Sequence, residues 1–540
     1  MDAYSMSFSS SSNIFKTPSK ILQDRERHLQ FDRSPRKLSI MDRVLQDIPQ
    51  LETLEPTKRP HIGIVGAGFA GLRCADILLR YGFQVTILEA RNRLGGRIYQ
   101  ERLPSGQFID MGANWIHGTT DNPIMDLARE TETSTTHEWD EQAFVFDQVG
   151  QFVDPRKAQA CSNMMWEIIR EASAHSRANQ HGSGIDPKET LWEFFQQEVL
   201  KRVPKTEKNY EEKRKLILQM ADLWGAFVGS PVQTQSLKFF WMEECIEGEN
   251  LFVTGTYRKI LEKVAQPAIN GAKIHLQARI TKVYGKSTSP CNTVKLETSD
   301  GRTFEFAQVV LTTPLGWLKQ NLQAFHPPLP ARLTQAIQNL GYGCLEKIYM
   351  TFPKAFWLIP DPKGHKFTGF GQWLSPSYTP ETNPAKWTNE VVELGSVKDG
   401  GHPTLLFYTY GEQSRHITSS LRRLKSEKDK REWLIRFFEP YYSKLPSYNP
   451  REDVPVAAIA TDWLGDDLAG NGSYVNFQKG LREGDKDIEV MRAGVPGEGI
   501  WLAGEHTAPF IALGTSTGAY WSGEGVASKV AGKVLGRGEV

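Results

Sequence analysis

Residues 61–97 read HIGIVGAGFAGLRCADILLRYGFQVTILEARNRLGGR. A short β-branched run precedes Gly66, Gly68 and Gly71, and a segment of helical periodicity leads to a second apolar run that ends at Glu89. The three glycines permit a tight turn, close approach of the backbone to a pyrophosphate, and close packing of a helix on a strand. The stretch therefore predicts a β-α-β unit that binds a dinucleotide.

The predicted helix and the acid at the end of the second strand narrow the choice of dinucleotide. Ala70, Cys74 and Leu78 fall on one helical face, and the helix N-terminus offers free N–H groups to a pyrophosphate. A carboxylate at Glu89 accepts both ribose hydroxyls and repels the extra phosphate of NADP. An ordinary α/β turn with a solvated basic loop would need all these features to coincide by chance.

Residues 89–97, EARNRLGGR, resemble the E-A-R-x-R-x-G-G-R fingerprint of the flavin-dependent amine oxidase superfamily. The resemblance implies FAD rather than a nicotinamide cofactor. It also implies that Ala90, Arg91 and Arg97 help to bind the flavin, and it adds Val283 from a later β-rich run.

The C-terminal stretch 499–535, GIWLAGEHTAPFIALGTSTGAYWSGEGVASKVAGKVL, predicts a strand, a glycine-rich loop and a helix that begins near Thr517. It resembles the closing F-x-G-E-x-T…G-A-x-x-S-G motif of the same superfamily. The resemblance implies that Gly504 allows close approach and that Glu505 holds the ribityl chain. Both ends of the chain would then bind FAD, unless this stretch is only a buried β-to-α packing unit.

The segment Gly112–Gly118, GANWIHG, follows Asp110 and resembles the G-A-x-W-I-H-G segment of polyamine oxidases. The resemblance implies that His117 faces the substrate and hydrogen-bonds an amine or acetamide nitrogen. A structural histidine is the alternative. The flavin-binding residues of this segment would be Gly112, Ala113, Asn114 and Trp115.

Lys347 lies in GCLEKIYMTFPKAFW, residues 343–357. This stretch resembles the K-I-x-L-x-F-x-x-x-F-W run whose lysine bridges the flavin N5 through a water. A desolvated lysine there would have a lowered pKa. The alternative is a strand lysine that extends to solvent.

Residues 471–476, NGSYVN, resemble the segment that carries one wall of an aromatic cage in front of the flavin. Tyr474 is the candidate wall, and an aromatic face can stabilise positive charge on an amine. Ser473 stands where monoamine oxidases carry the cysteine bonded to the flavin, which implies non-covalent FAD. Thr515 stands where many relatives have the second aromatic, which implies a half-open cage.

The chain order predicts an α/β fold built from a discontinuous Rossmann-like FAD-binding domain and a mixed α+β substrate-binding domain with a helical insertion. We assign residues 60–130, 250–320 and 486–540 to the first domain, and 131–249 and 321–485 to the second. Runs such as 162–172 and 211–227 are amphipathic and predict the inserted helices. Residues 1–59 are polar without an apolar period and predict a disordered or weakly helical extension.

Composition excludes several function classes. Lys and Arg number 64 against 63 Asp and Glu, so no charge excess favours nucleic acid. No apolar run is long enough to span a membrane. The cysteines are few, scattered and without a C-x-x-C pair, which favours a reducing, cytoplasmic location and leaves peroxisome and mitochondrion open. They are Cys74, Cys161, Cys245, Cys291 and Cys344.

An acid-rich run, WMEECIEGEN, contains Glu243, Glu244, Glu247 and Glu249. Such a run at the entrance of a site would attract a polycation. A solvated loop is the alternative.

These resemblances imply an oxidase that takes hydride from the carbon beside an amine nitrogen, with a small-molecule amine and O2 as substrates and no metal ion. A polyamine is the expected amine. A biosynthetic flavoenzyme acting on a natural product is the first alternative. A histone lysine demethylase is the second, although the chain shows no sustained coiled-coil heptads.

Overall fold

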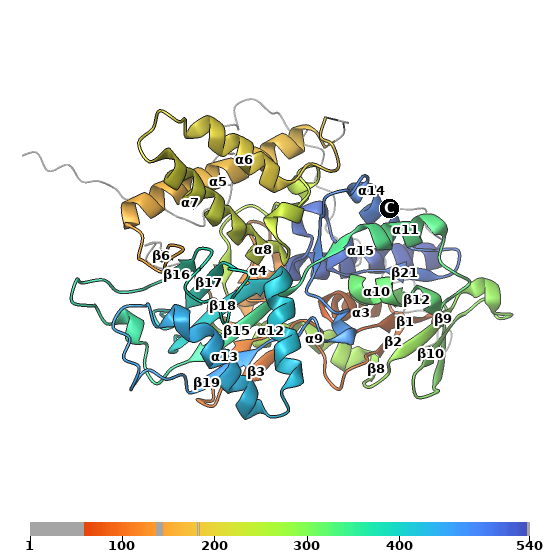
Figure 1. Cartoon of the computed structure of the whole chain (residues 1–540). Helices are drawn as coiled ribbons and strands as arrows, with labels where there is room; N and C mark the ends of the chain where they lie inside the picture. Colours follow the sequence, from red (N-terminus) through yellow and green to blue (C-terminus); the bar gives the residue numbers. More distant parts are fainter. Residues whose placement is uncertain (1–58, 137–143, 181, 183, 537–540) are drawn as a thin grey trace, which may run out of the picture.

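The computed structural model describes residues 59–136, 144–180, 182 and 184–536. The predicted extension of residues 1–59 therefore lies outside the described residues, apart from Arg59. Figure 1 shows two sheets side by side with a layer of helices above one of them.

The first sheet is five-stranded and parallel, in the order β21-β12-β1-β2-β8. It unites distant stretches of chain, because its strands are β1 (His61–Val65), β2 (Gln84–Leu88), β8 (Lys273–His275), β12 (Gln308–Leu311) and β21 (Ile500–Leu502). The strands β1 and β2 are buried except at their first residues, as parallel strands covered on both faces require. The predicted α/β fold with a Rossmann-like sheet is confirmed.

Helices from three separate stretches of the chain pack beside this sheet. They are α3 (Phe69–Arg80), α9 (Arg258–Gly271) and α15 (Ser516–Val534). The helices α3 and α15 approach closely, since a Cβ on Gly523 would lie 2.3 Å from the Ala70 carbonyl oxygen. This contact fixes the C-terminal helix against the first β-α-β unit.

A four-stranded sheet, β11-β10-β9-β13, extends this half of the molecule. Its strands are β9 (Ile280–Tyr284), β10 (Val294–Thr298), β11 (Thr303–Phe306) and β13 (Phe325–His326). Val283 points into the core between this sheet and its neighbours and is fully buried.

The second large sheet has six strands in the order β19-β15-β18-β17-β16-β6, antiparallel except where β6 joins β16. Its strands are β6 (Phe144–Phe146), β15 (Leu345–Thr351), β16 (Phe370–Trp373), β17 (Asn389–Glu393), β18 (Thr404–Tyr410) and β19 (Ala457–Ala460). Helices α12 (Gly411–Arg423) and α13 (Glu427–Tyr442) lie beside it. Lys347 therefore sits on a central strand, β15.

Three helices, α5 (Pro155–Ala178), α6 (Leu191–Arg202) and α7 (Tyr210–Ala221), form the layer above this sheet (Figure 1). Asp154 caps α5, and Thr190 and Glu193 form a capping box on α6. The second predicted helical run is interrupted after Ala221, where the 3₁₀ turn η2 (Asp222–Trp224) leads into α8 (Gly225–Val228). That turn directs Trp224 toward the cavity described below.

Smaller elements complete the fold. The two-stranded sheets pair β3 (Gln100–Arg102) with β4 (Phe108–Asp110), β5 (Trp115–Ile116) with β7 (Leu251–Phe252), and β14 (Gly341–Tyr342) with β20 (Val475–Asn476). The other α-helices are α4 (Pro123–Glu130), α10 (Leu315–Gln320), α11 (Ala331–Asn339) and α14 (Gly484–Ala493). Within the described ranges, no helix has the length and apolar composition needed to cross a bilayer.

Candidate active site

A cavity of about 410 Å³ lies between the two halves of the molecule. Its walls combine the β1–α3 turn, the loop before α15, the central strands β15 and β18, and the inserted helices. Apart from Gly71 and Val283, every residue predicted from the sequence to be catalytic or to bind the cofactor lines this cavity. Their individual roles stay predictions.

The glycine turn leaves room for a ligand at one of its three positions. Gly66 has φ of +103°, and a Cβ on Gly71 would lie 2.1 Å from the Gly66 carbonyl oxygen, so both positions need glycine to build the turn. A Cβ on Gly68 would meet only the Gly95 carbonyl oxygen, at 3.9 Å. The protein itself therefore leaves the space over Gly68 open, as close approach by a pyrophosphate requires.

Glu89 is held in place at the end of β2. Its carboxylate accepts hydrogen bonds from the backbone N–H of Ala67 at 2.7 Å and of Arg91 at 2.8 Å. The Arg91 guanidinium in turn pairs with Asp466 at 2.7 Å. These bonds hold the Glu89 carboxylate in one position, which suits a group that must bind a ribose with little rearrangement.

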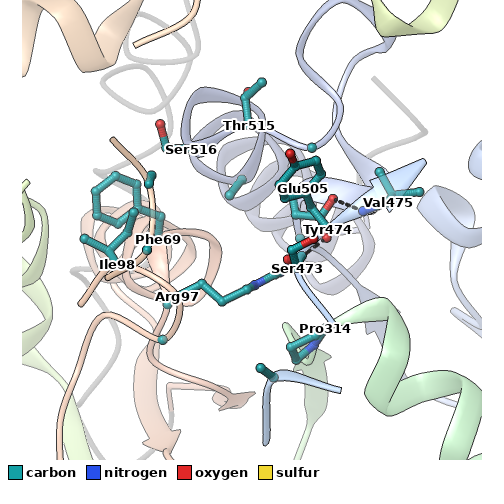
Figure 2. Close-up of a pocket in the computed structure, with 18 of the residues that line it drawn as sticks. Phe69, Arg97, Ile98, Pro314, Ser473, Tyr474, Val475, Glu505, Thr515 and Ser516 are labelled. Carbon is teal, nitrogen blue, oxygen red and sulfur yellow. Dashed lines mark hydrogen bonds and ion pairs between the residues drawn. The ribbon is translucent and has the colours of Figure 1, made fainter. Parts of the chain in front are cut away.

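Arg97 links the two ends of the chain. Its Nη1 donates to Glu505 Oε1 at 3.0 Å and to the Ser473 carbonyl oxygen at 2.5 Å. Glu505 Oε2 accepts the Val475 N–H at 3.3 Å. Figure 2 shows Arg97 extended across the cavity wall toward Ser473 and Glu505. Both Glu505 oxygens thus already hold protein groups, and the network fixes the segment that carries Tyr474.

The segment 112–118 forms another wall. A Cβ on Gly112 would lie 1.5 Å from the Arg97 carbonyl oxygen, so this position also needs glycine. Asn114 Nδ2 donates to Tyr349 Oη at 3.2 Å, and Trp115 Nε1 donates to Tyr408 Oη at 3.1 Å. These bonds attach the segment to the six-stranded sheet.

His117 stands in the cavity wall at the end of β5. Its Nδ1 is buried and has no hydrogen-bond partner among the described residues. Burial lowers the pKa of His117 to about 4. At neutral pH the imidazole is uncharged, so it is able to accept a hydrogen bond from an amine N–H.

Lys347 lines the cavity and is buried. Its Nζ donates to the carbonyl oxygens of Gly112 and, at 3.1 Å, of Asp110. Burial lowers the pKa of Lys347, and the nearby carboxyls of Asp110 and Glu346 oppose that shift. The lysine is therefore buried and easily deprotonated rather than extended to solvent.

Asp110 is the buried acid beside this lysine. Its carboxylate accepts Gln100 Nε2 at 2.6 Å and the Tyr257 N–H at 3.0 Å. Burial raises the pKa of Asp110. From the sequence we predicted no role for Asp110 beyond its place before the G-A-x-W-I-H-G segment.

Tyr474 and Thr515 both line the cavity, as Figure 2 shows. Tyr474 Oη donates to the Phe227 carbonyl oxygen at 2.6 Å, which fixes the ring. The Thr515 hydroxyl caps α15 by accepting the Gly518 N–H at 2.9 Å and donates to the Ala512 carbonyl oxygen at 2.7 Å. One ring and one small capping residue therefore stand at the two predicted cage positions.

Two predicted flavin-binding residues lie outside the cavity lining. Gly71 supports the turn from behind, in the helix-packing role expected of it. Val283 does not line the cavity, because its side chain fills the core under β9, and its role as a cofactor-binding residue stays a prediction. Ala278 and Ile280 of the same run line the cavity instead.

The four acids of 243–249 do not form an acidic entrance. Glu244 forms an ion pair with Arg177 and a hydrogen bond with Ser173. Glu243 lines the cavity, and burial raises its pKa to about 8, so the carboxyl is protonated at neutral pH. Glu247 and Glu249 are exposed and are not part of the lining.

The structure adds cavity residues that sequence reasoning missed. They are chiefly Trp166, Arg170, Trp224, Phe227, Phe240 and Tyr408. The amphipathic pattern of the insertion signals that its apolar side chains are buried. It does not distinguish a side chain that fills a core from one that borders a cavity.

Comparison with known proteins identifies the chain's relatives. The sequence profile of the family described as flavin containing amine oxidoreductase matches residues 69–531. Probable polyamine oxidase 4 of Arabidopsis thaliana is 27% identical over 85% of this chain and 84% of its own length. Lysine-specific histone demethylase 1 homolog 2 of the same plant is 27% identical over 86% of this chain but 58% of its own length.

A solved structure of a putrescine oxidase redesigned in its cofactor binding superposes with a TM-score of 0.62. It covers 87% of this chain and 99% of that one at 18% identity, which supports the shared fold. Because the family match covers residues 69–531, most of the chain, the chain belongs to the flavin-containing amine oxidoreductase family.

Proposed function

We propose that this flavin enzyme is an FAD-dependent oxidase of a polyamine or a related secondary or primary amine. In the net reaction the amine loses two electrons and two protons to O2, which gives an imine and H2O2, and water hydrolyses the imine to an aldehyde and an amine. The observation that carries the proposal is the cavity that gathers Lys347, His117 and Tyr474 beside the glycine turn and Glu89.

The residues fit FAD. The open space over Gly68, the bonded carboxylate of Glu89 and the free N-terminal end of α3 suit the ADP portion. FAD supplies a hydride acceptor when bound. Ser473 at the position of the bonding cysteine favours a non-covalent cofactor, and flavin released into the supernatant on acid precipitation would test that assignment.

The chain's own residues then prepare the amine. Neutral His117 accepts an N–H of the substrate, which keeps the nitrogen near the ring of Tyr474. Lys347, buried against the Asp110 and Gly112 carbonyl oxygens, holds a water or takes up a proton at Nζ. Orientation and desolvation supply the catalysis, and no nucleophile is required.

The relatives favour a polyamine-type substrate over a histone. The polyamine oxidase is matched over 84% of its length, whereas the chain spans only 58% of the histone demethylase. A natural-product amine remains the alternative that the substrate test separates.

The test is the visible spectrum of the flavin under anaerobic conditions. Spermine, spermidine, their N-acetyl forms and simple monoamines are added to the purified protein. Bleaching by at least one polyamine or acetylated polyamine, with H2O2 formed on return of air, supports the proposal. A bound flavin that no amine bleaches contradicts it.

A further inference from the structure

The cavity continues from the flavin-binding residues into an aromatic chamber under the helical insertion. Its rings are Trp166 of α5, Trp224 of η2, Phe227 of α8, and Phe240 of η4 (Phe240–Glu243). Trp224 lies at the centre, with ring centroids 5.1 Å from Phe227, 5.2 Å from Phe240 and 6.2 Å from Trp166. These walls are apolar except for Trp224 Nε1, which is buried without a partner among the described residues, so a charged group that enters needs a specific partner.

Arg170 supplies such a partner. It lies one helical turn after Trp166 on α5, lines the cavity and is half-buried. Within the described residues, its guanidinium makes no hydrogen bond or ion pair. The acids beside it on the helix, Glu167 and Glu171, are bound by Arg202.

The carboxyls of the chamber do not offset this charge. Glu244 is bound to Arg177. Glu243 Oε1 is buried without a partner among the described residues, and burial raises the pKa of Glu243 to about 8. At neutral pH the chamber therefore carries one unbalanced positive charge.

This charge disfavours a second ammonium at the far end of the substrate. Such a group would be repelled by Arg170 and would bind well only if Glu243 ionised. An oxygen acceptor has the opposite effect, because the planar guanidinium donates two parallel N–H groups to a carboxylate or one to an amide carbonyl. The rings around it exclude water and strengthen that bond.

We infer that Arg170 is a specificity-determining residue that binds an oxygen acceptor, a carboxylate or an amide carbonyl, at the end of the amine remote from the oxidised carbon. The inference rests on the proposed amine oxidation, and it narrows the substrate class to acylated or carboxylated amines over bare polyammonium chains. The two acceptors share one chemistry, so the experiment must separate them.

The experiment compares four series of matched chain length: monoamines, diamines, N-acetyl diamines and ω-amino acids. Apparent Kd and limiting rate come from anaerobic flavin bleaching by the wild type, Arg170→Met and Arg170→Glu. Arg156→Met is the matched control, since Arg156 is an exposed arginine on the same helix outside the cavity. Flavin content and melting temperature confirm that each variant is folded.

In the wild type we expect an acceptor-bearing series to bind more tightly than the diamines. In Arg170→Met the Kd ratio of that series to the matched monoamines should rise about tenfold, the scale of one charge-assisted bond. Arg170→Glu should favour the diamines, and Arg156→Met should change nothing. If the N-acetyl diamines bind more tightly, the acceptor is an amide carbonyl; if the ω-amino acids do, it is a carboxylate. Equal ratios in wild type and Arg170→Met would overturn the inference.

A binding readout separates this inference from the proposed function. Alkanoates and N-alkylacetamides lack an oxidisable amine and are titrated against the flavin spectrum of the same variants. If they bind the wild type more tightly than Arg170→Met while no amine bleaches the flavin, the acceptor site stands and the amine oxidase proposal fails. If amines bleach the flavin but neither readout depends on Arg170, the oxidase stands and the acceptor site fails.

Discussion

The flavin end and the aromatic chamber are built on different principles. At the flavin end, Gly66, Gly71 and Gly112 occupy positions where the backbone geometry or a neighbouring carbonyl leaves no space for a side chain. In the chamber, the rings come from four separate elements of the insertion, and none of the described insertion residues that line the cavity is a glycine. The cofactor site is thus fixed by backbone constraints, whereas the aromatic chamber is shaped by the side chains that face inward.

The difference shows what each region can tolerate. A backbone-constrained site loses its function through a single added methyl group, because the turn cannot relax around it. A chamber of side chains changes its dimensions and charge with little effect on the fold. Variation in specificity should therefore concentrate in the insertion.

The largest effect should follow Gly71→Ala. The new methyl group would lie against the Gly66 carbonyl oxygen, so we expect a loss of about 3 kcal/mol in the free energy of unfolding and loss of the flavin. Gly68→Ala is the comparison, because its methyl group meets open space; it should fold normally and bind flavin more weakly. Urea unfolding and flavin content measure both. Equal destabilisation by the two variants would contradict the assignment of the space over Gly68 to a ligand.

The next largest effect should follow Lys347→Met. We expect flavin reduction or reoxidation to slow by about 100-fold while the flavin stays bound, because Nζ is buried at the cavity and, among the described residues, donates hydrogen bonds only to two carbonyl oxygens. Stopped-flow absorbance measures both half-reactions. Lys354→Met, an exposed lysine in the same stretch that pairs with Glu452, is the control. Complete loss of flavin from Lys347→Met would show that the lysine is structural.

A smaller effect is expected from Glu89→Ala. The change removes the acceptor of the Ala67 and Arg91 N–H groups at the ribose position, and we expect flavin to dissociate about tenfold more readily. Gel filtration followed by flavin quantification measures retention. The remaining holoenzyme should keep the wild-type order of amine substrates, and an altered order would mean that the two regions are coupled.

The last effect depends on pH and concerns Glu243. Its pKa is raised from 4.5 to about 8 in the folded protein, so the unfolded chain releases this proton first and stability falls as pH rises between those values. Glu243→Gln removes this term. The melting temperature of the variant minus that of the wild type should increase as pH rises to 8. Above pH 8 this difference should stay constant. A gap that does not depend on pH would place Glu243 in solvent.

Much of the fold and of the cofactor site could be predicted from the sequence, because spacing along the chain encodes backbone geometry. The glycine turn, Glu89 and the helix at residue 516 all lie where local patterns placed them. Val283 does not line the cavity, whereas Ile280 of the same strand does, because a resemblance identifies a strand more easily than the residues of that strand that border a cavity.

The aromatic chamber was much less predictable from the sequence. Trp166, Arg170 and Trp224 look like ordinary members of amphipathic helices, and only tertiary packing turns them toward the cavity. The acid run was similarly ambiguous, because whether an acid attracts a polycation depends on partners such as Arg177, which lies far away in the sequence.

The central claim is that the flavin end, which is built by backbone constraints, retains the flavin, and that the aromatic chamber, which is built by side chains, selects the amine. The most direct measurement compares flavin content and relative anaerobic bleaching rates of the amine series in Glu89→Ala and Arg170→Met. We predict that Glu89→Ala loses flavin with an unchanged substrate order, and that Arg170→Met keeps its flavin with a changed order. A changed order in Glu89→Ala, or flavin loss in Arg170→Met, would contradict the account.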